Sequence, residues 1–152
     1  MRWLQRARRQ DGAALVETAF VLPIMLLVCI GILEFGRAYQ SWQVVTNASR
    51  EGARVAVLPD YTDASVRARV KTYLKNGGLS AAVVDSTATD IQITNTTINV
   101  NETGTVTAPA TRVQVHYPFE FMVLQPIAQL IVSDSKAGEA FDMVATTIMR
   151  NE

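Results

Sequence analysis

Residues Gly12 to Phe35 have the sequence GAALVETAFVLPIMLLVCIGILEF, and this stretch decides the fold of the chain. From Ala13 to Leu33 there are 21 residues, of which only Glu17 would carry a charge. As a helix with a rise of ~1.5 Å per residue they span about 31 Å, the thickness of the hydrocarbon core of a bilayer. The stretch therefore predicts a membrane-spanning helix over residues 13–33.

Glu17 distinguishes this helix from an ordinary anchor. It lies in the first turns of the apolar run, where an unpaired carboxylate costs roughly 2.5–3.5 kcal/mol on insertion scales. An acid inside a membrane segment is by default a functional site with a partner. If the chain is cut after Gly12, the new α-amine on Ala13 provides such a partner. Pro23 lacks an amide hydrogen, so it loosens the helix and predicts a kink.

The charge distribution predicts the orientation. The 152 residues carry no net charge, but residues 1–12 contain four arginines against one aspartate, which gives +3 and leaves −3 for the remainder. Basic residues beside a first membrane segment stay in the cytoplasm. We therefore expect a cytoplasmic basic leader over 1–12, a transmembrane part over 13–33 and one exported domain over 34–152. In a bacterium that domain is periplasmic and the anchor lies in the inner membrane.

A cleaved secretory signal peptide is the alternative for this region. Signal peptides have an apolar part of roughly 7–15 residues, followed by a cleavage site of small residues. The apolar run here is longer, and the segment Gly31 to Phe35 contains no A-x-A site. The lone cysteine, Cys29, lies inside the run, so no intramolecular disulfide can form.

The same helix is expected to continue beyond the membrane. Apolar and small residues recur at three- and four-residue spacing to about Val57, and Pro59 ends the pattern. Such a helix from Ala13 would have a length of roughly 67 Å. We expect the exported domain to pack on Phe35, Tyr39, Trp42 and Val45. Tyr39 and Trp42 could instead be anchors at the membrane surface.

The remaining sequence predicts an α+β domain. Asp60 or Thr62 can cap a short helix that Asn76-Gly77-Gly78 ends, and its basic side could contact lipid headgroups, an acidic partner or only solvent. Residues 79–90 have loop composition. Alternation then predicts strands around 91–100, 113–117 and 141–149, forming a small antiparallel sheet with one wet face. Residues 119–132 are expected to be a covering loop or a short helix.

Residues that could carry chemistry are few. One histidine, His116, and one membrane cysteine cannot build a clustered metal site or a Cys-His pair within one chain. Gly77-Gly78 follows a helix, whereas a phosphate-binding loop opens one. Neither a cofactor nor an enzymatic activity is expected, and no nucleic-acid partner.

The chain resembles the TadE-like minor pilins, or pseudopilins, of the Flp (tight-adherence) pilus system, which are relatives of type IV pilins. The resemblance rests on RRQDGAALVETAFVLPIMLLVCIGILEFGRAYQ near the N-terminus, NASREGARVAV at 47–57 and ATTIMRNE at the C-terminal end. It implies that a prepilin peptidase cuts between Gly12 and Ala13. Major pilins of that system tend to have a tyrosine after the glutamate and little beyond the helix, whereas this chain has Thr18 and a sizeable exported domain.

The resemblance implies partners and a role for Glu17. The partners would be other pilin or pseudopilin subunits, the prepilin peptidase, the inner-membrane assembly platform and the lipid bilayer. The new amine on Ala13 could pair with Glu17 of its own chain or with Glu17 of a neighbouring subunit. The resemblance to type IV pilins favours the pairing between subunits.

Three classes of function follow from the sequence. The first is a minor pilin in the assembly of an adhesive pilus. The second is a single-pass anchored periplasmic binding or scaffold protein with an uncut N-terminus. The third is a periplasmic enzyme that uses serine or carboxylate chemistry somewhere in 79–150. The N-terminal residue of the mature chain separates the first two.

Overall fold

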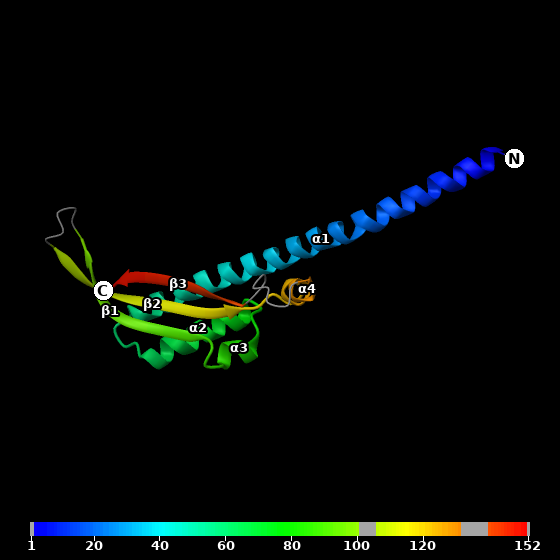
Figure 1. Cartoon of the computed structure of the whole chain (residues 1–152). Coiled ribbons are helices and arrows are strands. Elements are labelled where there is room, and N and C mark those ends of the chain that lie inside the picture. Colours follow the sequence, from blue (N-terminus) through cyan, green and yellow to red (C-terminus); the bar gives the residue numbers. More distant parts are fainter. Residues whose placement is uncertain (1, 101–105, 132–139, 152) are drawn as a thin grey trace.

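A computed structural model describes residues 2–100, 106–131 and 140–151 of the chain, and the side chains of 12–100, 106–130 and 140–151 among them. One helix, α1 (Arg2–Ala56), extends from the N-terminus across the whole molecule (Figure 1). It begins before Ala13, where the sequence predicted its start, and it ends three residues before Pro59. Its N-terminal half projects alone, and its C-terminal half lies on a small α+β domain.

From Gly12 onward, α1 is long and apolar enough to cross a membrane. The most apolar part of the helix is entirely unburied by the rest of the described chain. It is therefore unlike the core helix of a soluble protein, which its own domain covers. A single-pass membrane anchor accounts for this exposure.

The sheet has three strands: β1 (Asp90–Asn99), β2 (Thr107–Phe119) and β3 (Phe141–Arg150). Their order is β1-β2-β3 and both pairings are antiparallel, with Ile91 opposite Val115 and Val115 opposite Ala145. The three residues share one face because side chains alternate along a strand. The predicted α+β class, with a long helix, short helices and a small antiparallel sheet, is confirmed.

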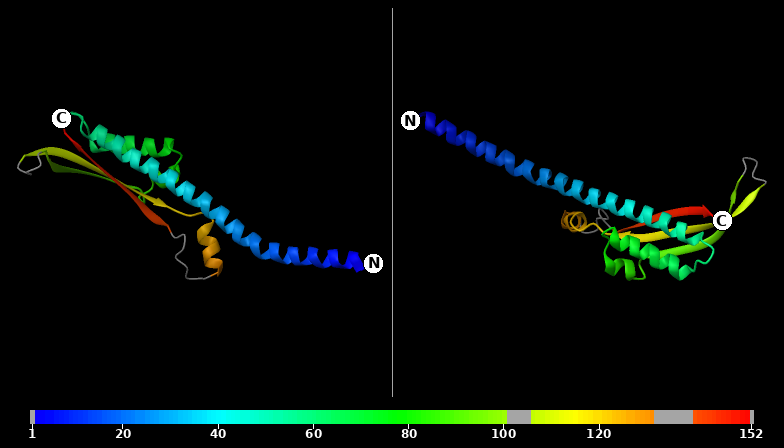
Figure 2. Two further views of the ribbon diagram at one scale, coloured as in Figure 1. Left: turned by 90° about the horizontal axis from the view of Figure 1, so that it is seen from above. Right: turned by 180° about the vertical axis from the view of Figure 1, so that it is seen from behind.

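Helices cover this apolar face and leave the other open (Figure 2). α1 lies on the sheet beside α2 (Asp63–Asn76), and α3 (Ala81–Asp85) follows α2. The core contains Val45 and Ala48 of α1, Val70 of α2 and Val113 and Val115 of β2. Residues of the opposite face, such as Gln92, Arg112 and Thr146, are exposed. The structure thus has the wet sheet face that alternation predicts.

The turn chemistry around α2 accounts for its limits. Thr62 caps the helix by accepting from the amide of Ser65, and the Ser65 hydroxyl accepts in turn from the amide of Thr62. Two otherwise unpaired amides are satisfied in this way. At the other end Gly78 has a φ of 86°, a left-handed conformation that favours glycine.

The prediction that Tyr39 and Trp42 pack against the domain is wrong, because their side chains are 66% and 43% exposed. Phe35 is also exposed and touches the domain through one ring contact, while Val45 is fully buried. Before Val45 the buried stripe lies one residue, or about 100°, away from Phe35, Tyr39 and Trp42, and from Val45 onward it follows the predicted spacing. It consists of Glu34, Ala38, Ser41, Val45, Ala48, Ser49, Gly52, Ala53 and Ala56.

This rotation has a simple physical reason. Small residues let the sheet and α2 approach the α1 backbone closely, whereas the large aromatic side chains are left outside. Because the Trp42 ring is 43% exposed, Trp42→Ala should cost less than the about 3–5 kcal/mol typical of a fully buried tryptophan.

Two connections differ from or refine the sequence expectation. Residues 79–90 include the short helix α3, whose Val84 is fully buried, although the composition predicted a loop. Between β2 and β3 lies α4 (Leu124–Ile131), within the segment expected to be a covering loop or a short helix. Pro126 is tolerated there because the first amides of a helix have no intrahelical acceptor.

Candidate functional site

Gly12, Ala13 and Glu17 lie in the uninterrupted helix α1, and all three are exposed. A Cβ atom added at Gly12 would meet nothing within 4 Å. Ala13 and Glu17 are four residues apart and therefore share one face of the helix. The predicted processing bond and the predicted assembly acid are accessible together on a part of α1 that the domain does not cover.

Glu17 stands at one end of a shallow groove along this helix. Its lining is Glu17, Thr18, Val21, Leu22, Met25, Leu26 and Cys29. The Thr18 hydroxyl donates to the carbonyl oxygen of Ala14 at 2.8 Å, so it is satisfied within the helix. The groove therefore presents an apolar surface with a single carboxylate at its N-terminal end.

Pro23 lies inside the same apolar part of α1. Figure 2 shows the helix bending in this part, which is coloured blue, whereas the part that lies on the domain is nearly straight. Proline removes the hydrogen bond to the carbonyl of the residue four positions earlier, here Ala19. A kink at Pro23 itself stays a prediction.

A second cluster lies where the apolar run ends. Glu34 is only 7% exposed, and its Oε2 accepts from the amide of Met122 at 2.9 Å. Arg37, one turn later, pairs with Glu34 at 3.6 Å and donates to the carbonyl oxygen of Glu120. Its guanidinium also stacks over the ring of Phe119 at 4.9 Å. Two charged side chains of α1 thus hold the chain that leaves β2.

Aromatic rings surround this junction. Phe119 and Phe121 pack edge to face at 5.3 Å, and each also lies within 6.0 Å of Phe141. Phe35 of α1 adds an edge contact to Phe121 at 5.8 Å. Edge-to-face pairs contribute roughly 0.5–1.5 kcal/mol beyond burial. The ends of β2 and β3 are therefore tied to α1 at the level of Glu34.

The sequence contained a signal for this junction. Glu34 and Arg37 are one helical turn apart at the end of an apolar run, a spacing at which opposite charges meet. Nothing in the pattern indicated that the acid would be buried, because its partner is a backbone amide 88 residues away in sequence.

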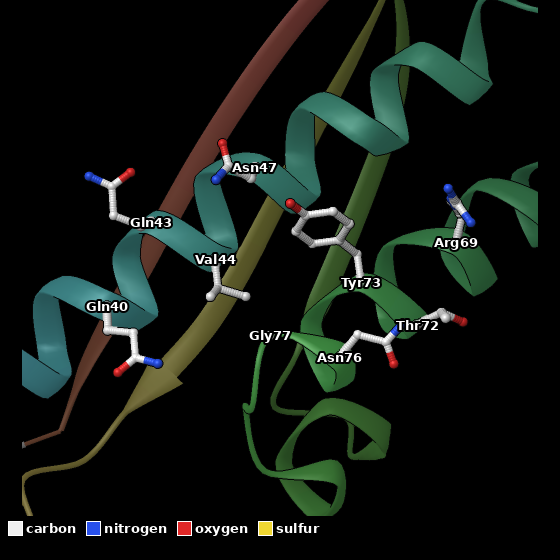
Figure 3. A pocket seen from close by; sticks show the side chains of 9 residues that line it. All are labelled: Gln40, Gln43, Val44, Asn47, Arg69, Thr72, Tyr73, Asn76 and Gly77. Carbon is white, nitrogen blue, oxygen red and sulfur yellow. The ribbon is translucent and has the colours of Figure 1, made fainter.

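A polar groove of about 530 Å³ separates α1 from α2 (Figure 3). Four primary amides line it, those of Gln40, Gln43, Asn47 and Asn76, together with Val44, Arg69, Thr72, Tyr73 and Gly77. Figure 3 shows the Tyr73 ring lying across the gap toward Asn47. The lining offers hydrogen bonds to an uncharged polar group, and its one guanidinium is already engaged elsewhere.

That guanidinium belongs to an ion-pair cluster between the helices. Glu51 accepts from Arg54 at 2.9 and 3.0 Å and from Arg69 at 2.7 and 2.9 Å. Hydrogen bonds from Arg54 and then Arg69 lower the pKa of Glu51 from 4.5 to about 2. Lys75 pairs with Asp85 at 2.8 Å. Two of the basic residues of α2 thus have internal partners.

The structure indicates no catalytic centre among its described residues. His116 Nδ1 lies 2.6 Å from Asp142 Oδ2 on the wet side of the sheet. Among the described residues, no serine or cysteine side chain is hydrogen-bonded to this pair. Within residues 12–100, 106–130 and 140–151, no three His, Cys, Asp or Glu side chains are grouped to hold a metal.

Residues 12–54 match the model of a family described as TadE-like protein. This stretch of the chain is TadE-like. The match begins at Gly12 and ends within the last turn of α1. It therefore covers Glu17, Pro23, Glu34 and Arg37.

The resemblance found from the sequence is confirmed over the TadE-like stretch. TadE-like proteins are associated with the Tad pilus and are generally structural. The sheet and the helices α2, α3 and α4 lie outside the matched residues. No curated protein and no solved structure matches the chain significantly.

Proposed function

We propose that this protein is a minor pilin or pseudopilin, a non-enzymatic component in the assembly of a Flp/Tad-type adhesive pilus. One observation supports this most strongly: the TadE-like match includes the apolar part of α1, which the rest of the described chain leaves uncovered. A helix that is exposed along its apolar length needs lipid, or other helices, around it.

The proposed location is the bacterial inner membrane. Residues 13–33 span the bilayer once, the basic leader 1–12 stays in the cytoplasm and the domain 34–152 lies in the periplasm. The excess of arginine before the span favours this orientation. The structure supports the division at Leu33, because Glu34 is the first buried residue of α1 from Gly12 onward and bonds the amide of Met122 in the domain.

Processing would prepare the helix for assembly. A prepilin peptidase cuts between Gly12 and Ala13, and the new amine is then a cation near the entrance of the hydrocarbon. Glu17 of a neighbouring subunit neutralises it, and the pair fixes the axial register of the two helices. Opposite charges interact far more strongly in such a medium than in water. The apolar groove that leads away from Glu17 offers the neighbour's helix a contact surface.

The first prediction tests processing. Mature protein from cells that contain the peptidase should begin at Ala13, as measured by N-terminal sequencing and intact mass. Gly12→Asp puts a bulky acid at the cut bond and should leave the precursor intact. Gln10→Asp adds the same charge two residues earlier and serves as the control.

Recovery of the wild-type chain with residues 1–12 attached, in cells that make pili, would contradict the proposal. That result would favour the second candidate, a single-pass anchored periplasmic scaffold protein. The amide-lined groove between α1 and α2 is the surface on which such a protein would bind a polar partner.

A further inference from the structure

The segment from Phe121 to Ile131 contains no charged residue. Its outer side is strongly exposed, with Met122 at 74% and Leu130 at 86%. Val123, just before α4, and Pro126 of α4 are also exposed, and Gln129 is the one exposed polar residue among them. The inner side, which carries Leu124 and Ile127, is half-buried. Since one side already faces the protein, the other side is an apolar surface without a partner in the described chain.

The position of this surface is fixed by the junction with α1. The amide of Met122 donates to Glu34, the first residue after the apolar run. Figures 1 and 2 show α4 beside α1, at the end of the sheet nearest the apolar part of the helix. The exposed side chains of α4 therefore start at the height where the proposed span ends.

The surface is continuous with the span itself. Ile32 and Leu33, the last residues of the apolar run, are largely exposed, and so is Phe35. Phe35 contacts Phe121, whose neighbour Met122 begins the exposed side of the segment. The apolar surface thus passes from α1 to α4 without an intervening charge, while Glu34 and Arg37 are turned toward the domain and paired.

We propose that α4 and Met122 lie in the outer interfacial layer of the same bilayer that α1 spans. This inference rests on the membrane anchoring proposed above. An uncharged helix with exposed Pro126 and Leu130, preceded by the exposed Met122 and lying level with the end of a span, gains the transfer free energy of its apolar area by entering the headgroup and acyl boundary. A site for a second protein would not need to lie at that height.

The consequence is a second point of attachment. A single helix can rotate about its axis and tilt in the bilayer, since a span fixes neither. A second contact through α4, joined to α1 by the Glu34 and Arg37 bonds, fixes which side of the sheet domain faces the membrane. The groove between α1 and α2 and the wet face of the sheet then have defined orientations for approaching subunits.

The experiment measures immersion depth in the full chain. A Cys29→Ser background is reconstituted in phosphatidylcholine/phosphatidylglycerol vesicles, with a spin label on a single cysteine at Leu130, Met122, Leu27 or Thr97. Leu27 lies in the span, and Thr97 is exposed at the far end of β1, opposite Pro109. Collisions with oxygen, which concentrates in lipid, are compared with collisions with a water-soluble nickel complex.

For labels at positions 130 and 122, the ratio of oxygen collisions to nickel collisions should exceed the ratio at position 97 and lie closer to the ratio at position 27. This result should not depend on the protein-to-lipid ratio. A ratio at 130 equal to that at 97 would overturn the inference. Protection that appears only at high protein density would also overturn it, because a second copy would then be the cover. A label at 27 without immersion would instead defeat the membrane anchoring on which the inference rests.

Discussion

Gly52 and Gly36 are both helical glycines of α1 with opposite surroundings. A Cβ at Gly52 would lie 2.5 Å from Cγ2 of Val70 and 3.2 Å from Cγ1 of Val113, whereas one at Gly36 would meet nothing within 4 Å. Val70 is fully buried, and a β-branched side chain has little rotamer freedom with which to yield. Gly52 is therefore required where α1, α2 and β2 meet.

The second prediction follows from this pair. Gly52→Ala should destabilise the fold by about 1–3 kcal/mol, because the extra methyl overpacks the core. Gly36→Ala should stabilise it by roughly 0.5–1 kcal/mol, because glycine loses more backbone entropy in a helix. Urea unfolding of the full chain in detergent measures both. Similar losses in the two variants would show that α1 does not approach α2 as described.

Glu51 makes stability depend on pH, and this is the third prediction. Its folded pKa of about 2 lies below the ordinary 4.5, so the charged form is favoured by folding. The contribution is present in full above about pH 4.5 and is lost as the pH falls toward 2. Glu51→Gln should therefore be less stable than wild type at pH 7, and the difference should vanish near pH 2.

Asp60→Asn is the matched control for Glu51→Gln. Asp60 is an exposed acid for which the described residues offer no ion pair. Its variant should follow the wild-type curve of urea midpoint against pH. A Glu51→Gln curve parallel to wild type from pH 7 to 2 would contradict the role of the two arginines.

The junction between α1 and the segment that leads into α4 holds the domain at a fixed position relative to the apolar part of α1. In the fourth prediction, Glu34→Ala leaves the amide of Met122 without its acceptor and removes the carboxylate that pairs with Arg37, at a cost of roughly 1–3 kcal/mol. Hydrogen exchange at Met122 should quicken markedly, because local opening becomes easier.

Glu120→Ala serves as the control for that prediction. Arg37 bonds the backbone carbonyl of Glu120, which the substitution retains, so exchange at Met122 should stay near its wild-type rate. Equal acceleration in both variants would mean that the segment is held by its apolar contacts alone.

Sequence patterns predicted the helices and strands better than they predicted which side of each one is buried. Alternation around Ile91 and Val113 indicated strands because one sheet face is buried and the other is wet. The face of α1 was assigned to Tyr39 and Trp42 because large side chains usually mark a core. Apart from Glu34 and Val45, the actual contact stripe is alanine, serine and glycine, whose small size lets the backbones approach and leaves little signal in hydropathy.

The candidate site was accessible to sequence reasoning only in part. Glu17 and Pro23 are recognisable because they interrupt an apolar run, where every polar or helix-breaking residue is conspicuous, and Gly12 because it stands immediately before that run. The Glu34 contact to Met122 depends on the fold bringing 34 and 122 together, and α3 depends on packing of Val84 against the core. Local pattern carries neither kind of information.

At the scale of the whole molecule, the fifth prediction concerns joining one subunit to the next. Glu17→Gln keeps size and hydrogen bonding but removes the charge that would meet the amine of a neighbouring Ala13. The variant should insert and be cut, yet crosslink poorly to partner pilins and give few pili. Val16→Thr, an uncharged change at the adjacent exposed position outside the groove, should assemble normally. Normal crosslinking and piliation of the Gln variant would show that Glu17 has no role in assembly and is only an acid tolerated at headgroup depth.

The division of α1 into a bare part and a packed part also sets its mechanical behaviour. Under a load along the axis, residues 34–56 share the force with the sheet and α2, whereas residues 13–33 carry it through helical hydrogen bonds alone. Pro23 has already removed one of those bonds. Uncoiled to about 3.3 Å per residue, those 21 residues would lengthen from about 31 Å to roughly 70 Å. The uncovered part is thus the more extensible of the two parts of α1, because no packing against the domain adds to its helical hydrogen bonds.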